Sequence, residues 1–248
     1  MISDFIEIFI LSIIQGVSEF LPVSSASHLI LASNIYEFKN QSLLIDISLH
    51  LGSLLAILFY FKDDVFNFNK NKNLFYKIII GTIPLIIIGY FLYTTNVIDY
   101  FRNIKVIAWA TLFFGILLYI ADKNKFLKKI DVDFNMKSVL IIGFFQVLAL
   151  IPGVSRSGIA ITAARFLKFE RVDSAKISFL ISIPVLGAVS IFGLKNIFLS
   201  ESQYVAKLNI FAIIFAFFFS LITIKYFLKY LNKFSLNVFA YYRFLIGI

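Results

Sequence analysis

Long apolar stretches recur along this chain and limit what it can fold into. Of its 248 residues, 60% are hydrophobic and only 15% are charged, and the mean hydropathy is +0.91. A soluble domain of similar length is roughly half apolar and a quarter charged. Lipid must therefore cover much of the apolar surface, and each crossing needs a helix of roughly 20 apolar residues. We expect a polytopic membrane protein of the all-α class.

Six uninterrupted apolar stretches are predicted to cross the membrane. These predicted spans are residues 42–61, 75–93, 105–121, 175–194, 208–230 and the shorter 234–248. Two further apolar regions, 2–32 and 138–167, are interrupted in the middle by polar and helix-breaking residues. All of these segments are expected to belong to a single membrane domain, residues 1–248.

The distribution of Lys and Arg predicts how the segments are oriented. The loops near 62–77, 122–137, 168–176 and 225–233 are rich in these residues, whereas 94–104 and 195–207 are poor in them. The positive-inside rule places the four basic loops in the cytoplasm. Region 138–167 then begins and ends on the same side, so we predict a re-entrant hairpin there and, by the same argument, at 2–32. Each half, about 1–121 and 138–248, has one hairpin and three spans, which gives an inverted-topology repeat.

Two short sequence echoes favour this repeat. Gln15 followed by Leu21-Pro-Val-Ser-Ser25 resembles Gln146 followed by Ile151-Pro-Gly-Val-Ser-Arg-Ser157. The segment Gly81-Thr-Ile-Pro84 likewise resembles Ser182-Ile-Pro184, and the four prolines of the chain all lie in these segments. Inverted repeats with broken helices commonly build a site at the interface between the repeats.

The second interruption, Pro152-Gly-Val-Ser-Arg-Ser-Gly158, predicts an anion site. Pro and Gly end one helix and a new helix begins after them, so free N–H groups, two hydroxyls and a guanidinium come together. It is not a Walker loop, because the required Gly-Lys-Ser/Thr is missing. The alternative is a helix break with a snorkelling Arg. We predict that phosphate is bound by Gly153, Ser155, Arg156, Ser157 and Gly158, together with Ser24 from the first interruption.

The first interruption, Glu19-Phe-Leu-Pro-Val-Ser-Ser-Ala-Ser-His28, contains a carboxylate at membrane depth. Charged residues there are costly and are functional by default. Gln15 and Glu19 are four residues apart and share a helix face. Their oxygens suit Mg²⁺ or Ca²⁺ if a diphosphate and water supply further ligands. The alternative is that Glu19 pairs with Arg156, and both arrangements are compatible in the resting state.

The same interruption predicts a nucleophile and a base. Ser25 and His28 are three residues apart, within reach on a helix, and a hydroxyl nucleophile needs an adjacent base. Ser25 is the candidate nucleophile, and attack by water without a phosphoenzyme is the alternative. His28 is therefore a candidate base or acid, the alternative being a hydrogen-bonded structural residue. Asp46 and His50 are four apart, and we interpret them as a satisfied polar pair.

These residues carry a resemblance to the undecaprenyl-diphosphate phosphatase family, the integral-membrane bacitracin-resistance type. The family's Glu/Gln-x-x-x-Glu element followed by Phe-Leu-Pro-Val-Ser-Ser-x-x-His stands here as residues 15–28. Its Pro-Gly-x-Ser-Arg-Ser-x-x-Thr element stands here as residues 152–160, with Ala160 in place of Thr. Thr162 lies roughly 200° further around a helix and cannot take that place. Leu49-His-Leu-Gly-Ser-Leu-Leu-Ala56 and Tyr242-Arg243 are also similar to the family.

The resemblance implies hydrolysis of undecaprenyl diphosphate to the monophosphate and phosphate, which recycles the lipid carrier of peptidoglycan and gives resistance to bacitracin. It also implies a divalent cation and the bacterial inner membrane. From the residues alone, a transporter or flippase of a phosphate-bearing lipid remains the alternative. The net charge of +9 is explained by loops that set topology and meet anionic headgroups, so nucleic-acid binding is not expected. Whether the chain forms a homodimer stays open.

Overall fold

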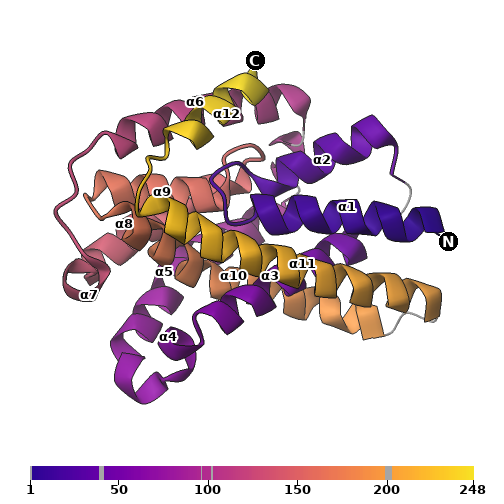
Figure 1. Cartoon of the computed structure of the whole chain (residues 1–248), viewed down its shortest axis with the longest axis horizontal. Coiled ribbons are helices and arrows are strands. Elements are labelled where there is room, and N and C mark those ends of the chain that lie inside the picture. Colours follow the sequence, from indigo (N-terminus) through magenta and orange to yellow (C-terminus); the bar gives the residue numbers. More distant parts are fainter. Residues whose placement is uncertain (1, 39–41, 96, 102, 199–202) are drawn as a thin grey trace.

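The computed structural model describes residues 2–38, 42–95, 97–101, 103–198 and 203–248, and no β-strand occurs in these ranges. Figure 1 shows the helices, which follow one another along the chain as α1 (Ile2–Ser18), α2 (Ser25–Tyr36), α3 (Leu43–Tyr60), α4 (Lys62–Phe66), α5 (Phe68–Thr94), η1 (Val97–Phe101), α6 (Ile104–Asp122), α7 (Ile130–Asp133), α8 (Met136–Val147), η2 (Leu148–Leu150), α9 (Arg156–Phe166), α10 (Arg171–Phe198), α11 (Gln203–Leu231) and α12 (Asn237–Gly247).

Among the described residues, five helices are long and apolar enough to cross a membrane. These segments are Leu43–Tyr60, Asn71–Leu92, Ile104–Asp122, Arg171–Ile191 and Gln203–Leu231, and they match five of the six predicted spans. The sixth predicted span, 234–248, contains α12, which has only 11 residues. At 1.5 Å per residue α12 is about 16 Å long, roughly half the hydrocarbon thickness of a bilayer. The prediction of an all-α, multi-pass membrane protein is confirmed.

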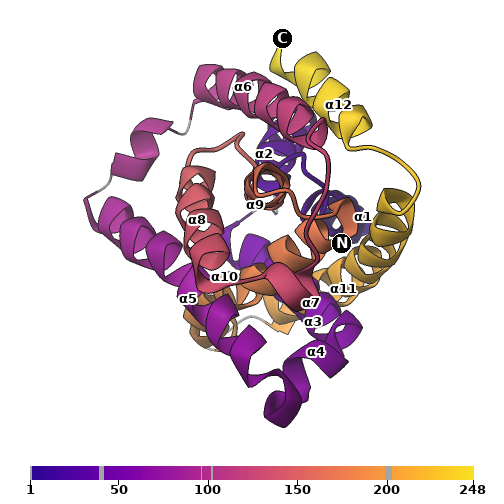
Figure 2. The same cartoon turned by 90° about the vertical axis from the view of Figure 1, so that its left-hand side faces the viewer.

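Both interrupted regions fold as helical hairpins. Helix α1 packs on α2, and α8 packs on α9. The second arms, α2 and α9, have 12 and 11 residues. Neither arm is longer than about 18 Å, so neither crosses a bilayer alone. Figure 2 shows α9 near the centre of the molecule with other helices around it.

The two hairpins share an unusual backbone conformation at their breaks. Ser24 has a φ of 76° and Ser155 a φ of 71°, and each residue directly precedes the second arm of its hairpin. An L residue at positive φ costs about 1–3 kcal/mol and persists only where its surroundings hold it. Ser24-Ser25 and Ser155-Arg156 are therefore equivalent in structure, as the first sequence echo predicts.

Each hairpin packs its first arm against a long helix from the other half. Helix α1 lies along α11, and α8 packs on α5, while α3 and α10 pack on each other. Helix α5 is the second long helix after the α1–α2 hairpin, and α11 is the second long helix after the α8–α9 hairpin. The first arm of each hairpin therefore packs on the equivalent helix of the other half. The repeat boundaries at 1–121 and 138–248 remain a prediction.

The second pair of similar segments, 81–84 and 182–184, does not occupy equivalent positions in the two halves, contrary to our expectation. Pro84 lies in α5, the second long helix of its half, whereas Pro184 lies in α10, the first long helix of its half. The short motif instead marks where these two helices meet. Thr82 Oγ1 donates hydrogen bonds to the carbonyl of Ile78 at 2.8 Å and to that of Ile181 at 3.2 Å.

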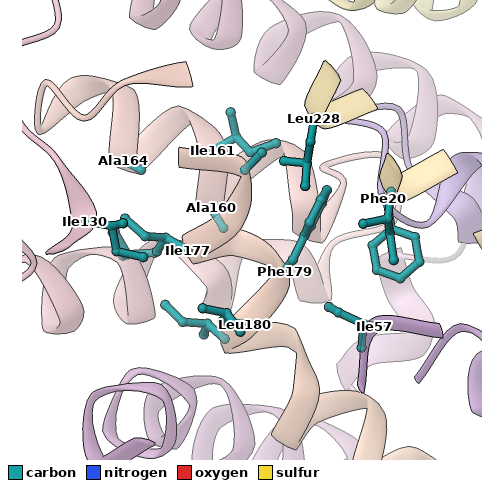
Figure 3. Packing of buried hydrophobic residues seen from close by; sticks show 14 of the residues in the cluster. Phe20, Ile57, Ile130, Ala160, Ile161, Ala164, Ile177, Phe179, Leu180 and Leu228 are labelled. Carbon is teal, nitrogen blue, oxygen red and sulfur yellow. The ribbon is translucent and has the colours of Figure 1, made fainter. Parts of the chain in front are cut away.

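An aromatic core lies directly behind the first break. The Phe20 ring packs edge-to-face on Phe179, with 5.1 Å between ring centroids, and Ile57 belongs to the same buried cluster (Figure 3). Phe20 and Phe179 are each 1% exposed. Because Phe20 directly follows Glu19, the core fixes the backbone that carries this carboxylate.

Candidate active site

A cavity of about 660 Å³ lies between the two breaks. One end is polar, and the remainder is apolar and lined mainly by α5 and α10. The polar end contains Glu19, Ser24, Ser25, His50, Ser155, Arg156 and Ser157. The two hairpins therefore bring most of the predicted site residues to one place.

Glu19 and Arg156 form an ion pair across the two halves of the chain. Arg156 Nη2 donates to Glu19 Oε1, and the two side chains are 15% and 4% exposed. In the resting protein the guanidinium neutralises a carboxylate that is otherwise costly to bury. The pairing that the sequence left as an alternative is thus present, inside the cavity.

The hydroxyl of Ser25 is bonded to the same carboxylate. Ser25 Oγ donates to Glu19 Oε2 at 2.6 Å, and Gln15 Nε2 donates to that oxygen at 3.0 Å. A general base must lie within about 2.6–3.2 Å of the group whose proton it takes. Glu19 meets this condition for Ser25.

The ring nitrogens of His28 bond groups other than the Ser25 hydroxyl. Its Nδ1 is 2.7 Å from the carbonyl oxygen of Ser24, its Nε2 is 2.6 Å from Tyr242 Oη, and its ring stacks on Tyr242 with centroids 5.7 Å apart. His28 is not among the cavity-lining residues. The contact predicted from the i,i+3 spacing is not formed, because Ser25 begins α2 and turns towards Glu19 while both ring nitrogens of His28 have other partners. His28 instead holds the turn that carries Ser24.

His50 was interpreted from sequence as a partner of Asp46, and it belongs to the cavity. His50 Nδ1 lies 2.9 Å from Gln15 Nε2 and 3.6 Å from Glu19 Oε2. Its place depends on α3 packing beside α1, which sequence spacing does not reveal. The one available signal was a titratable residue inside an apolar span, which is functional by default.

The start of α9 carries the residues of the predicted anion site. Ser155, Arg156 and Ser157 line the cavity, and Ser155 Oγ accepts from the N–H of Gly158 at 3.1 Å. Gly153 and Gly158 lie behind this surface and do not line the cavity. Gly153 has a φ of 96°, and a Cβ on Gly158 would lie 2.9 Å from Arg243 Nη1. Both glycines therefore shape the loop, and their contact with phosphate stays a prediction.

The residues predicted to hold Mg²⁺ or Ca²⁺ offer a partial set of oxygen ligands. Gln15 Oε1 is buried without a hydrogen-bond partner, and the two oxygens of Glu19 face Arg156 and Ser25. In the described part of the chain no three His, Cys, Asp or Glu side chains cluster to form a complete metal site. These cations take six or more oxygens, so the Gln15–Glu19 pair fits one only if phosphate and water supply the others.

Comparison with known proteins gives matches along the whole chain. The sequence matches the family described as bacitracin resistance protein BacA over residues 8–248. A protein of Pelagibacter ubique named undecaprenyl-diphosphatase is 53% identical over 249 residues, which cover 100% of this chain and 97% of that protein. Proteins of the same name from Campylobacter curvus and Hahella chejuensis are each 38% identical; the alignments cover 99% and 98% of this chain and 97% and 95% of those proteins.

Proposed function

This chain belongs to the bacitracin resistance protein BacA family, and from this premise we propose that it hydrolyses undecaprenyl diphosphate to undecaprenyl phosphate and inorganic phosphate. The observation that carries the proposal is the meeting of Glu19, Ser25 and Arg156 at the polar end of one cavity. The reaction recycles the lipid carrier of peptidoglycan in the bacterial inner membrane, and it gives resistance to bacitracin.

The start of α9 binds the diphosphate. A guanidinium has five N–H donors, so Arg156 keeps donors for phosphate while one faces Glu19. The hydroxyls of Ser155 and Ser157 and the positive end of the α9 dipole add further attraction for an anion. These fixed donors neutralise the charge that develops as the bridging P–O bond breaks.

Ser25 attacks the terminal phosphorus. Its Oγ forms a bond to phosphorus as its proton passes to Glu19, 2.6 Å away. The bridging oxygen leaves with undecaprenyl phosphate and takes the proton from Glu19. Water then attacks the phosphoserine, again giving its proton to Glu19, and that proton passes to Ser25 Oγ as inorganic phosphate is released. Gln15 and His50 hold Glu19 in place.

A divalent cation fits this site as a supplement to the chain's own charges. Glu19 and the amide oxygen of Gln15 would hold it, and when bound it would neutralise phosphate oxygens. The resting ion pair explains how the carboxylate is kept ionised before substrate and cation arrive.

The apolar part of the cavity suits a polyprenyl chain. It is lined by Leu85, Ile86 and Tyr90 of α5 and by Leu186 and Val189 of α10. Three of these, Ile86, Tyr90 and Val189, are 45%, 72% and 38% exposed, so the cavity continues to the outer surface between α5 and α10. A lipid substrate therefore enters sideways from the bilayer, with its tail on these side chains and its diphosphate at Arg156.

The test is phosphate release by the purified full chain from undecaprenyl diphosphate in detergent. We expect rapid release from the polyprenyl substrate and slow release from inorganic diphosphate, which has no tail to bind. The rival transporter is tested in vesicles with the same protein. Movement of the lipid diphosphate across the bilayer without phosphate release would overturn the proposal.

A further inference from the structure

Arg243 of α12 is a buried arginine that donates four hydrogen bonds to backbone carbonyls. It is 1% exposed. Its Nε donates to Thr111 O at 3.1 Å, its Nη1 to Pro22 O at 3.2 Å and to Val154 O at 2.9 Å, and its Nη2 to Gly153 O at 2.9 Å. No carboxylate in the described part of the chain forms an ion pair with it. A buried cation without a counter-ion is costly, so this one calls for an explanation.

The carbonyls that Arg243 binds belong to both breaks. Pro22 lies two residues before Ser24, and Val154 directly precedes Ser155. Ser24 and Ser155 are the two serines held at positive φ. One guanidinium thus ties the strained turn of the first hairpin to that of the second, and Thr111 O anchors both to α6.

The surroundings of Arg243 are shaped to let it reach these carbonyls. A Cβ on Gly158 would lie 2.9 Å from Arg243 Nη1, and a Cβ on Gly115 would lie 2.9 Å from Arg243 Cβ. Helix α12 packs along α6, and Figure 1 shows the two side by side. The arginine therefore enters through a path kept open by two glycines.

The neighbouring residue of α12 holds the first break at a second point. Tyr242 Oη lies 2.6 Å from His28 Nε2, and His28 Nδ1 lies 2.7 Å from the carbonyl of Ser24. Two consecutive residues of α12 therefore reach the backbone on both sides of Val23, directly or through His28.

We propose that Arg243 is a positioning residue for phosphate hydrolysis. It holds the two breaks in register, so that Glu19 and Ser25 of the first face Arg156 of the second. This role rests on the proposed function. The planar fork of a guanidinium suits it, because its donors have fixed directions that an ammonium cannot reproduce.

The kinetic test compares Arg243→Met with Arg243→Lys. Arg243→Met lowers kcat per folded molecule by about 100-fold, since a misplacement of about 1 Å at a reacting centre has that effect. KM changes by less than about threefold, because the residues that bind phosphate remain. Arg243→Lys regains about tenfold of the lost kcat through its three donors. A kcat for Arg243→Met within about threefold of wild type would overturn the proposal.

Arg165→Met is the matched control for burial. Arg165 is also 1% exposed and binds the carbonyls of Asp122 and Asn124, but it lies at the other end of α9 and outside the cavity lining. Its loss lowers thermal stability while kcat per folded molecule stays within about threefold. An equal loss of kcat in Arg165→Met and Arg243→Met would show a merely structural role for Arg243.

Gly158→Ala keeps the proposal testable if Arg243→Met does not fold. The added methyl group would lie 2.9 Å from Arg243 Nη1 and 3.0 Å from Ser155 Oγ. It displaces Arg243 from Pro22 and Val154, so kcat falls by about 100-fold and a thiol introduced by Val154→Cys becomes accessible to maleimide, both as in Arg243→Met. A wild-type kcat in Gly158→Ala would contradict the proposal that Arg243 holds the two breaks in register.

A labelling experiment separates this role from the proposed function. The chain has no cysteine and Val154 is fully buried, so Val154→Cys introduces a single buried thiol in the second break. A small maleimide labels this thiol at least about tenfold faster when Arg243→Met is added, because the loop opens. Equal labelling rates would overturn the positioning role. If the wild-type protein releases no phosphate, the proposed function fails. The labelling rates still show whether Arg243 holds the two breaks together.

Discussion

Glu19 of the first half and Arg156 of the second half form a buried ion pair at the polar end of the cavity, 137 residues apart in sequence. The Glu19 carboxylate also accepts a hydrogen bond from the Ser25 hydroxyl. Glu19 stabilises the Arg156 guanidinium in the resting protein and accepts the Ser25 proton during turnover. When diphosphate binds, it must therefore replace Glu19 as the partner of Arg156.

Replacing Glu19 by Gln removes the charge and keeps the shape. Arg156 is left uncompensated and Ser25 loses its base, so phosphate release falls by at least about 1,000-fold. The free energy of unfolding falls by about 3 kcal/mol, because breaking a buried pair leaves a buried charge. Phosphate release and thermal unfolding in the same detergent measure both effects, and activity within about tenfold of wild type would remove Glu19 from the mechanism.

Ser25→Ala distinguishes attack by serine from attack by water. If Ser25 is the nucleophile, its loss lowers turnover by at least about 1,000-fold, and acid-quenched wild-type reactions contain phosphoserine at Ser25, detected by mass spectrometry. Ser27→Ala serves as the control and retains much more activity, because the Ser27 hydroxyl lies 3.0 Å from that of Ser24 and Ser27 does not line the cavity. Turnover of Ser25→Ala within about tenfold of wild type would assign the attack to water.

His28 is expected to act through the turn that it holds. His28→Gln retains groups that can bond Ser24 O and Tyr242 Oη, whereas His28→Ala removes both contacts. We expect His28→Gln to be at least about tenfold more active than His28→Ala. Equal and near-complete loss in both variants would return to His28 the role of base or acid that its sequence spacing suggested.

Gln15 and Glu19 are expected to share a divalent cation with the substrate. EDTA abolishes phosphate release, and added Mg²⁺ or Ca²⁺ restores it. Gln15→Met raises the cation concentration needed for half-maximal activity by about tenfold. Full activity in EDTA would remove the cation from the proposal, and an unchanged requirement in Gln15→Met would remove Gln15 as a ligand.

Most of the fold could be predicted because it is set locally. A bilayer demands long apolar helices, and five of the six predicted spans are found among the described residues. The two hairpins followed from polar residues and helix breakers inside apolar runs. Apolar composition alone was misleading for the sixth predicted span. Residues 234–248 are as apolar as a span, but the helix that they form, α12, has only 11 residues.

The site could be predicted in part. The Ser155-Arg156-Ser157 group and Glu19 stand out because charge and hydroxyl groups at membrane depth have few structural uses. The hydrogen-bond and ion-pair partners of these side chains could not be predicted from the sequence, because they depend on how α1, α3 and α12 pack. For that reason the spacing favoured His28 as the histidine of the site, whereas His50 is the one that lies beside Glu19. Arg243 appeared only as part of a family motif.

The most direct test of the central claim is phosphate release from undecaprenyl diphosphate by purified Arg156→Ala. Arg171→Ala is the control, because Arg171 Nε pairs with Asp122 at 2.8 Å and does not line the cavity. We predict that Arg156→Ala stays folded by circular dichroism and loses at least about 1,000-fold in kcat/KM, whereas Arg171→Ala stays within about tenfold of wild type. A folded Arg156→Ala protein that turns over at the wild-type rate would contradict the account.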